Sequence, residues 1–312
     1  MHGASECAST KGNTRWQDPS PHWVKRNSGT MKTLKIVLSV LFVLAVGFFV
    51  VRGCIHRKPH PIFEERAERV LPEKKIRMAA PAAKGPGPAG APVAGRIAVI
   101  LDDWGNNYSL TALAEEIGRP VTLSVLPNLK QSRRIAEEAH RHGLGVMLHL
   151  PMQPKGGRQP LEPHTILVTM PDAEIVQYLK EALAAVPHVE GVNNHMGSAA
   201  TSDARVMKTV LSYLKERNLF FVDSSVVRET QGPRVAAELG LRFAKRDVFI
   251  DNELEEGAVR RRLEEAKRIA LTRGQAIVIG HDKKVTLKTI KAVVPEFEKE
   301  GIRFVLVKEL LE

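Results

Sequence analysis

The pattern of hydrophobic and polar positions changes character at Arg96. From there onward, short apolar runs alternate with longer segments in which apolar residues recur at helical spacing. Short apolar runs are typical of buried strands, and the longer periodic segments are typical of amphipathic helices. The runs predict strands over residues 97–101, 145–148, 191–194, 220–222 and 276–280. The periodic segments predict helices over residues 109–117, 131–142, 172–186, 203–217, 255–272 and 286–299.

Start and stop signals support these helices. Asp172 and Asp203 stand where two helices are expected to begin, and a side-chain oxygen there can accept hydrogen bonds from free first-turn amides. Gly143 and Gly240 stand where helices are expected to end. The alternation of strands and helices predicts an α/β fold with parallel strands. About seven strand–helix units in roughly 215 residues favour a single barrel-like domain over two domains.

The region before Arg96 has a different organisation. An apolar run without charge lies within residues 34–55 and is flanked by basic residues, and residues 56–95 are rich in Pro, Ala and Gly. The run is slightly shorter than the roughly 20 residues that span a bilayer, but flanking Lys and Arg can extend it. We therefore expect a polar segment over 1–33, a transmembrane signal anchor over 34–55, a linker over 56–95 and a folded domain over 96–312.

Other interpretations of the apolar run stay open. A cleaved signal peptide and a lipoprotein processed near Cys54 are alternatives, and Met31 is a candidate for the true start. With an uncleaved anchor, we expect a single-pass protein of the inner membrane. Its C-terminal domain would then lie in the periplasm or otherwise outside the cytoplasm.

The net charge and the cysteines exclude two classes of protein. The formal net charge is +11, but about nine of these charges lie before Arg96 and only about two after it. The folded domain therefore carries no basic stripe, and no motif of a base-reading protein is present, so we expect no nucleic-acid partner. The cysteines, Cys7 and Cys54, both precede Arg96, which argues against a disulfide-stapled fold and a cysteine zinc cluster.

Chemically active side chains follow the predicted strands. The residues at these strand ends are Asp102, Asp103, His149, His195, Asp223 and His281. Carboxyl ends of parallel strands share one face, where α/β proteins build their sites, so we expect several of these side chains to converge. One Asp and two His form the ligand set of a catalytic zinc or a related divalent metal.

The adjacent carboxylates Asp102 and Asp103 suggest a division of roles. Neighbouring residues on a strand point in opposite directions, so one could bind a cation while the other removes a proton from water. His281 suits a general acid, because the ordinary pKa of imidazole lies near neutral pH. Helix capping is the alternative role for the Asp pair, and burial in the core is the alternative for His149.

A second group of polar residues could contact substrate or orient a histidine. Asn194, Asp223 and Asp247 are the candidates for substrate binding, and Asp251 is a further candidate of the same rank. Each carboxylate could equally be a strand-end acid or part of a surface ion pair.

Six ordered motifs carry a resemblance to a known family. They are Leu-Asp-Asp-Trp-Gly at 101–105, Leu-His-Leu-Pro-Met at 148–152, Gly-Val-Asn-Asn-His-Met-Gly-Ser at 191–198, Phe-Val-Asp-Ser at 221–224, Arg-Asp-Val-Phe-Ile-Asp-Asn at 246–252 and Ile-Gly-His at 279–281. Together they resemble the divergent polysaccharide deacetylase family, a remote branch of the NodB-like superfamily. The resemblance implies a distorted (β/α) barrel with fewer than eight strands and a divalent metal, with zinc as the first expectation.

The resemblance also implies roles for individual residues. Asp102 matches the catalytic base, Asp103 and His149 match metal ligands, and His281 is similar to the catalytic acid. The position expected for the second metal histidine holds Gln153, and His195 could supply that ligand from another strand. The arginine motif that supports the base in other polysaccharide deacetylases is not recognisable.

Two functions of different classes follow. The first is a membrane-anchored, metal-dependent deacetylase acting on an N- or O-acetylated cell-envelope polysaccharide, such as an amino-sugar glycan. The second is a catalytically inactive envelope protein that binds glycan or a protein partner through the same groove. A hydrolase of another ester or amide is a third reading, because water activated in this way attacks any accessible carbonyl.

Overall fold

The computed structural model describes residues 93–156 and 160–311. The expected N-terminal segment over 1–33 and the expected anchor over 34–55 lie outside these residues, as does the linker up to residue 92. Within the two described ranges, no helix combines the length and the apolar character needed to cross a membrane.

The strands of the described residues form one sheet in which every pairing is parallel. Eight strands follow the order β6-β5-β4-β3-β2-β1-β8-β7, and β9 pairs with the first half of β1. Their bounds are β1 Gly95–Trp104, β2 Thr122–Val125, β3 Gly145–Met152, β4 Gly191–Met196, β5 Phe220–Asp223, β6 Phe243–Lys245, β7 Val248–Phe249, β8 Gln275–His281 and β9 Ile302–Val305.

Helices occupy most of the connections between strands. They are α2 Thr111–Glu115, α3 Ser132–Arg141, α4 Asp172–Ala185, α5 Ala204–Lys215, α6 Gly232–Leu239, α7 Glu256–Arg273 and α8 Lys284–Lys299. Short 3₁₀ turns cover Tyr108–Leu110, Ala200–Ser202 and Val307–Leu310. All six predicted helices are present within a few residues of their expected bounds. No sequence signal predicted the start of α6, but the helix ends where expected, because Gly240 adopts the left-handed conformation with φ +60°.

The sheet curls into a distorted barrel. Its two edge strands, β6 and β7, are separated in the chain only by Arg246 and Asp247. The Arg246 amide donates to the Asp223 carbonyl on the β5 side, and the Asp247 amide donates to the Ile277 carbonyl on β8. The chain thus steps directly from one edge of the sheet to the other. The predicted (β/α) barrel is confirmed. The resemblance implied fewer than eight strands, whereas the described residues form nine, since the short strands β6, β7 and β9 also join the sheet.

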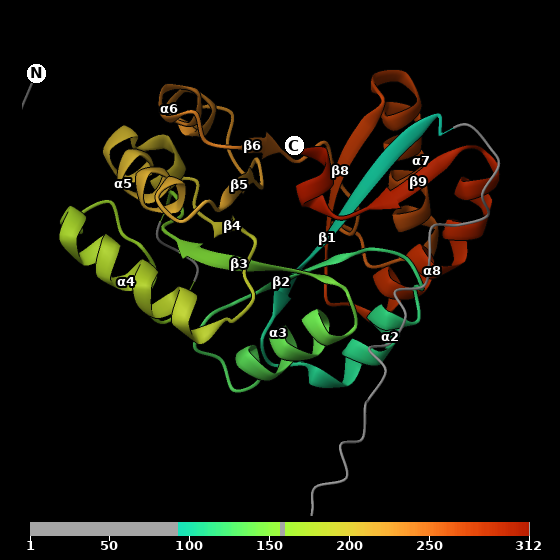
Figure 1. Ribbon diagram of the computed structural model, residues 1–312, viewed down its shortest axis with the longest axis horizontal. Coiled ribbons are helices and arrows are strands. Elements are labelled where there is room, and N and C mark those ends of the chain that lie inside the picture. Colours follow the sequence, from blue (N-terminus) through green and yellow to red (C-terminus); the bar gives the residue numbers. More distant parts are fainter. Residues whose placement is uncertain (1–92, 157–159, 312) are drawn as a thin grey trace, which may run out of the picture. The chain divides into compact units, whose positions relative to one another are not determined.

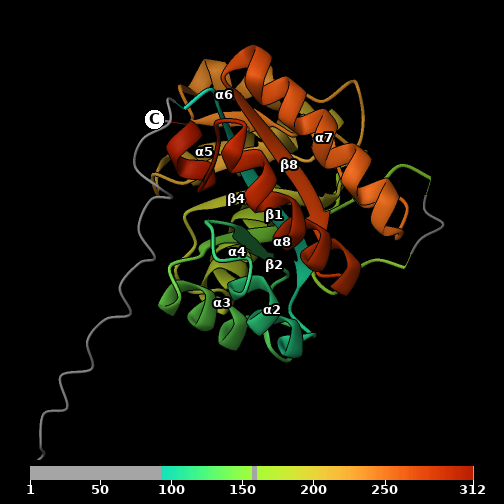
Figure 2. The ribbon, with the colours of Figure 1, turned by 90° about the vertical axis from the view of Figure 1, so that its right-hand side faces the viewer.

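Side chains alternate between the inside of the barrel and the helices around it. In Figure 1, α4, α5 and α6 lie beside β3 to β5, and Figure 2 shows α7 and α8 in front of β8. Ile97, Val99 and Leu101 on β1 pack toward the helices. The residues between them point inward, and an apolar cluster from β1, β3, β5, β8, β9 and the last 3₁₀ turn fills the interior: Ala98, Ile100, Met147, Phe220, Val222, Ile277, Ile279, Val305, Val307 and Leu310. Burying a side chain of this size contributes about 1.5–3 kcal/mol.

The inward-facing positions change from apolar to polar residues toward the carboxyl ends of the strands. The next inward position on β1 after Ile100 is Asp102, and the next on β3 after Met147 is His149. The next on β8 after Ile279 is His281. Apolar side chains therefore close one part of the barrel interior, and polar side chains gather at the carboxyl end.

Candidate metal centre

A bulge at the end of β1 directs two consecutive carboxylates to the same place. Leu101 pairs with Leu123 and Trp104 with Val125, so Asp102 and Asp103 together oppose a single residue of β2. Asp103 adopts the left-handed conformation with φ +65°, which Asp tolerates better than most residues. The expectation that the two side chains point in opposite directions is therefore wrong, because it assumed a regular strand. Both carboxylates contact His149.

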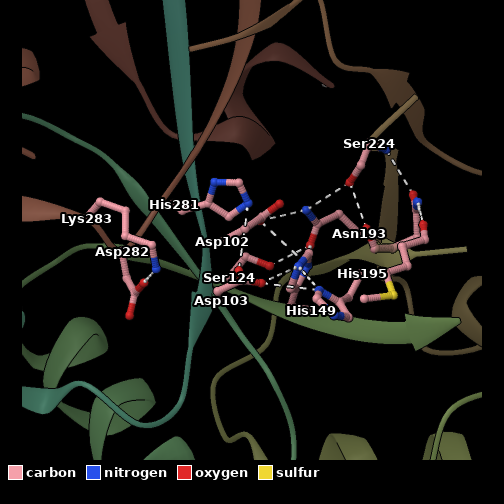
Figure 3. Close-up of polar contacts among 12 residues, drawn as sticks. Asp102, Asp103, Ser124, His149, Asn193, His195, Ser224, His281, Asp282 and Lys283 are labelled. Carbon is pink, nitrogen blue, oxygen red and sulfur yellow. Dashed lines mark hydrogen bonds and ion pairs between the residues drawn. The ribbon is translucent and has the colours of Figure 1, made fainter. Parts of the chain in front are cut away.

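Three ligand atoms from three strands form a compact triangle. His149 Nε2 lies 3.3 Å from Asp103 Oδ1, and His195 Nδ1 lies 3.2 Å from the same oxygen. The two histidine nitrogens are 3.1 Å apart. A tetrahedral ion at about 2.0–2.1 Å from its ligands holds neighbouring ligand atoms roughly 3.3–3.4 Å apart. The spacing of the triangle therefore fits three ligands of a tetrahedral ion (Figure 3).

The Asp103 oxygen in this triangle has no oriented hydrogen-bond partner. Oδ1 is buried and accepts no hydrogen bond, although the nitrogens of His149 and His195 lie near it. Such a buried polar atom without a partner is costly. A divalent cation would satisfy this oxygen and the lone pairs of both imidazoles at once. The donor set therefore fits a divalent metal of the zinc type.

Without a cation, the charges of these residues compensate one another. Burial raises the pKa of Asp103, but the close approach of the His149 and His195 nitrogens and the attraction of His149 and His281 outweigh it and hold that pKa well below its usual range. Burial lowers the pKa of His149, but attraction to Asp102 and Asp103 outweighs it and raises that pKa to about 9. His149 therefore carries a proton at neutral pH that a metal must displace.

Asp102 lies beside the triangle without being part of it. Its carboxylate is 3.6 Å from His149 Nδ1 and accepts a hydrogen bond from Asn193 Nδ2 at 2.9 Å. Burial raises its pKa above the ordinary value, against the attraction of His149. The guanidinium of Arg246 is near enough for Asp102 to attract it, and burial lowers the pKa of that guanidinium. A buried carboxylate with a raised pKa suits a general base.

His281 lies on β8, next to Asp102 in the register of the two strands, and approaches the other oxygen of Asp103. Its Nε2 is 3.8 Å from Asp103 Oδ2, and its Nδ1 is 2.9 Å from Asp251 Oδ1. Asp251 also accepts from the His281 amide and the Thr286 hydroxyl, so three hydrogen bonds hold its carboxylate. Burial lowers the pKa of His281, but the hydrogen bond and attraction of Asp251 outweigh it and raise that pKa. An imidazole with one nitrogen held by a carboxylate presents the other for proton transfer.

The three residues expected to bind substrate lie elsewhere. Asn194 donates to the Met196 carbonyl and accepts from the Ser224 amide, which ties β4 to β5. Asp223 accepts from Thr230 and the Ser225 amide and organises the loop before α6. Asp247 accepts from the Ile277 amide on β8. All three carboxylate or amide groups are used within the fold, and the structure does not bring them to the triangle.

Gln153 likewise has a local role. Its side-chain oxygen accepts from the Val168 amide, which pins the connection between β3 and α4. His195 on β4 supplies the nitrogen that the family pattern leads one to expect at position 153.

Sequence reasoning missed Asn193 and Arg246 and placed Asp251 only in the second rank. Strand alternation could have found Asn193, because residues 193 and 195 share a face of β4 whereas 194 lies on the other. No sequence signal places Arg246 beside Asp102, since the contact depends on the step between β6 and β7.

A second group of possible metal ligands on the surface does not form a site. Glu115 contacts His142 Nδ1 at 3.4 Å, and Glu138 contacts His142 Nε2 at 3.1 Å. The two carboxylates thus face different nitrogens of one ring, whereas an ion takes a single nitrogen from each imidazole. This arrangement is an ion-paired surface histidine.

Two curated bacterial proteins are similar in sequence to this chain. An uncharacterized protein of Escherichia coli K12, YibQ, is 35% identical over 206 residues, which covers 65% of this chain and 63% of that protein. The chain thus spans less than two thirds of that relative. A protein of Haemophilus influenzae is 30% identical over 197 residues, covering 63% of this chain and 70% of that protein.

A solved structure and a family model also match the chain. The crystal structure of an uncharacterized protein from Agrobacterium tumefaciens C58 matches with a TM-score of 0.67 at 25% identity, covering 73% of this chain and 93% of that one. The model of the divergent polysaccharide deacetylase family matches residues 99–311, well over half of the chain. The chain therefore belongs to the divergent polysaccharide deacetylase family, as its motifs predicted.

Proposed function

We propose that the protein is a metal-dependent hydrolase that removes acetyl groups from a cell-envelope polysaccharide. The observation that carries the proposal is the triangle of Asp103 Oδ1, His149 Nε2 and His195 Nδ1, with Asp102 beside His149 and His281 near the second oxygen of Asp103. Membership of the family supports the reaction class. The N- or O-acetylated substrate and the requirement for a metal are parts of the proposal.

The residues divide the reaction between them. Asp103, His149 and His195 would hold a divalent ion, zinc being preferred by this donor set. When bound, such an ion polarises a carbonyl and makes water easier to deprotonate. Asp102 removes a proton from the attacking water, a role that its raised pKa favours. His281, oriented by Asp251, donates a proton to the departing sugar nitrogen or oxygen.

Two departures from the family pattern motivated the alternative of an inactive binding protein. His195 occupies the ligand position that Gln153 does not fill. Arg246 lies close enough to Asp102 to interact with it electrostatically, as the arginine that supports the base does elsewhere in the superfamily. Both departures thus have a counterpart from another part of the barrel, which supports the catalytic proposal over the binding alternative.

The proposal places this domain outside the cytoplasm. The apolar segment over 34–55 would anchor the chain, and the linker over 56–95 would hold the barrel away from the inner membrane. Extraction of cell membranes at alkaline pH tests the anchor. The full-length chain is expected to stay with the membrane fraction, and its complete release would contradict the anchor.

Acetate release tests the function most simply. Full-length protein loaded with zinc is incubated with N-acetylglucosamine oligomers, peptidoglycan and acetylated envelope polysaccharides, and free acetate is measured. We expect release by the wild type and a loss of at least about 100-fold in Asp102→Asn, which keeps the metal ligands. Specific binding of these glycans without acetate release would favour the binding alternative.

A further inference from the structure

One buried amide lies between the metal triangle and the base. Asn193 is completely buried and sits directly beside His149 in the register of β3 and β4. Its Oδ1 is 3.0 Å from His149 Nδ1 and accepts a hydrogen bond from the Ser124 hydroxyl. Its Nδ2 donates to Asp102 Oδ1 at 2.9 Å and to the Ser224 hydroxyl at 3.3 Å. The four partners surround the amide (Figure 3).

These partners leave the amide a single orientation. A carboxylate only accepts hydrogen bonds, so the NH₂ group must face Asp102 and the carbonyl oxygen must face His149. An amide oxygen cannot donate, so the hydrogen between Asn193 and His149 belongs to His149 Nδ1. The proton that a metal displaces from the ring is therefore the one on Nε2, and once it has left, Nε2 offers its lone pair to the metal.

The amide also separates His149 from Asp102. The direct distance from His149 Nδ1 to Asp102 Oδ1 is 3.6 Å, too long for a good hydrogen bond. Asn193 is nearer to both groups and has no proton that it can pass between them. His149 and Asp102 therefore perform separate tasks although they lie side by side.

We propose that Asn193 is a positioning residue whose two amide atoms serve different parts of the reaction. Its Oδ1 fixes the form of His149 that offers Nε2 to the metal. Its Nδ2 holds the Asp102 carboxylate in place for removal of a proton from water. This inference rests on the proposed function, because it assigns tasks within the same site.

The proposal predicts that two substitutions of Asn193 have different effects. In Asn193→Asp, an oxygen still accepts from His149 Nδ1, so the affinity for metal stays within about threefold of the wild type or rises. The second oxygen faces Asp102 and cannot donate, so the two carboxylates compete for one proton. The kcat for acetate release then falls at least about 100-fold, with little change in KM.

In Asn193→Ala both hydrogen bonds are lost. Metal affinity then falls about 10–100-fold, as is usual when the partner of a ligating histidine is removed, and kcat falls as well. Asn194→Asp is the matched control, since it places the same carboxylate on the opposite face of β4. We expect it to lower the melting temperature without changing metal affinity more than about threefold.

The experiment titrates each full-length variant with Co²⁺, follows its visible absorption spectrum, and measures acetate release from N-acetylglucosamine oligomers. The proposal is supported if Asn193→Ala loses metal affinity whereas Asn193→Asp keeps its metal affinity and loses kcat. Equal losses of metal affinity in both variants, or an unchanged kcat in Asn193→Asp, would overturn it. No acetate release by the cobalt-loaded wild type would contradict the proposed function alone. The cobalt affinities of the two variants would then still test whether Asn193 Oδ1 holds His149 in the form that binds metal.

Discussion

The inside of the barrel has two regions built by the same strands on the same alternation. In the apolar region, Ile100, Phe220 and Val222 pack against one another and need no specific partner. At the carboxyl end, Asp102, His149 and Asn193 are just as buried, and each depends on a particular hydrogen bond or ion pair. The apolar region therefore stabilises the fold. The polar region costs free energy of folding, because it buries charged and polar groups that a reaction can use.

The largest expected effect concerns the polar region. His195→Ala removes one corner of the ligand triangle on a half-buried side chain, so we expect metal affinity to fall at least about 1,000-fold and acetate release to disappear. The melting temperature without metal should change by only a few degrees. Metal titration and thermal denaturation of the same preparation check this. A variant that retains metal but unfolds easily would reverse the comparison.

A substitution in the apolar region should do the opposite. Phe220→Ala leaves a cavity in the barrel interior and should lower the free energy of unfolding by about 3–5 kcal/mol. The metal affinity of the folded protein should stay unchanged. Denaturant unfolding combined with Co²⁺ titration measures both quantities. A large loss of metal affinity in the folded variant would mean that the two regions are not separate.

The polar region should also respond to pH. The pKa of His149 is raised from 6.5 to about 9 in the absence of metal, so its proton must leave when a metal binds. Metal affinity should therefore rise about tenfold per pH unit from pH 7 and level off near pH 9. The stability of the metal-free protein has the opposite dependence, because the contribution of charged His149 is complete below pH 6.5 and is lost as the pH rises through about 9. Calorimetric titration in buffers with different ionisation enthalpies counts the released protons, and an absence of proton release would contradict this.

The smallest effect concerns the acid. Asp251 holds His281 and raises its pKa, against the lowering by burial. In Asp251→Asn that pKa should fall, so the protonated acid is lost at lower pH. The alkaline limb of the pH profile of kcat should then move to lower pH by about one unit. A profile that keeps its alkaline limb would show that His281 is not the acid.

The sequence predicted the strands and the polar residues that follow them better than it predicted how these side chains are placed in the barrel. Apolar runs located β1, β3, β4, β5 and β8, and each was correctly followed by a polar residue at the carboxyl end. The strands β2, β6, β7 and β9 were not predicted. β6 and β7 have only three and two residues, and the pairing of all four strands depends on distant parts of the chain.

Single positions show why the site could not be completed from the sequence. The bulge at Asp102 and Asp103 depends on pairing with β2, which no local pattern encodes. Asn194 was chosen as a candidate although Asn193 faces the triangle, since the choice between them requires the phase of β4. Asp251 reaches His281 through the turn after β7 and the start of α8, a contact that exists only in the folded barrel.

The proposed function depends on Asp103, His149 and His195 holding one divalent metal ion. Crystals of the full-length protein grown with zinc, measured at the zinc absorption edge, locate bound ions by anomalous scattering. We expect one strong peak per chain at about 2.0–2.2 Å from Asp103 Oδ1, His149 Nε2 and His195 Nδ1. A peak only at another position, such as the surface group of Glu115, Glu138 and His142, or no peak at all, would contradict it.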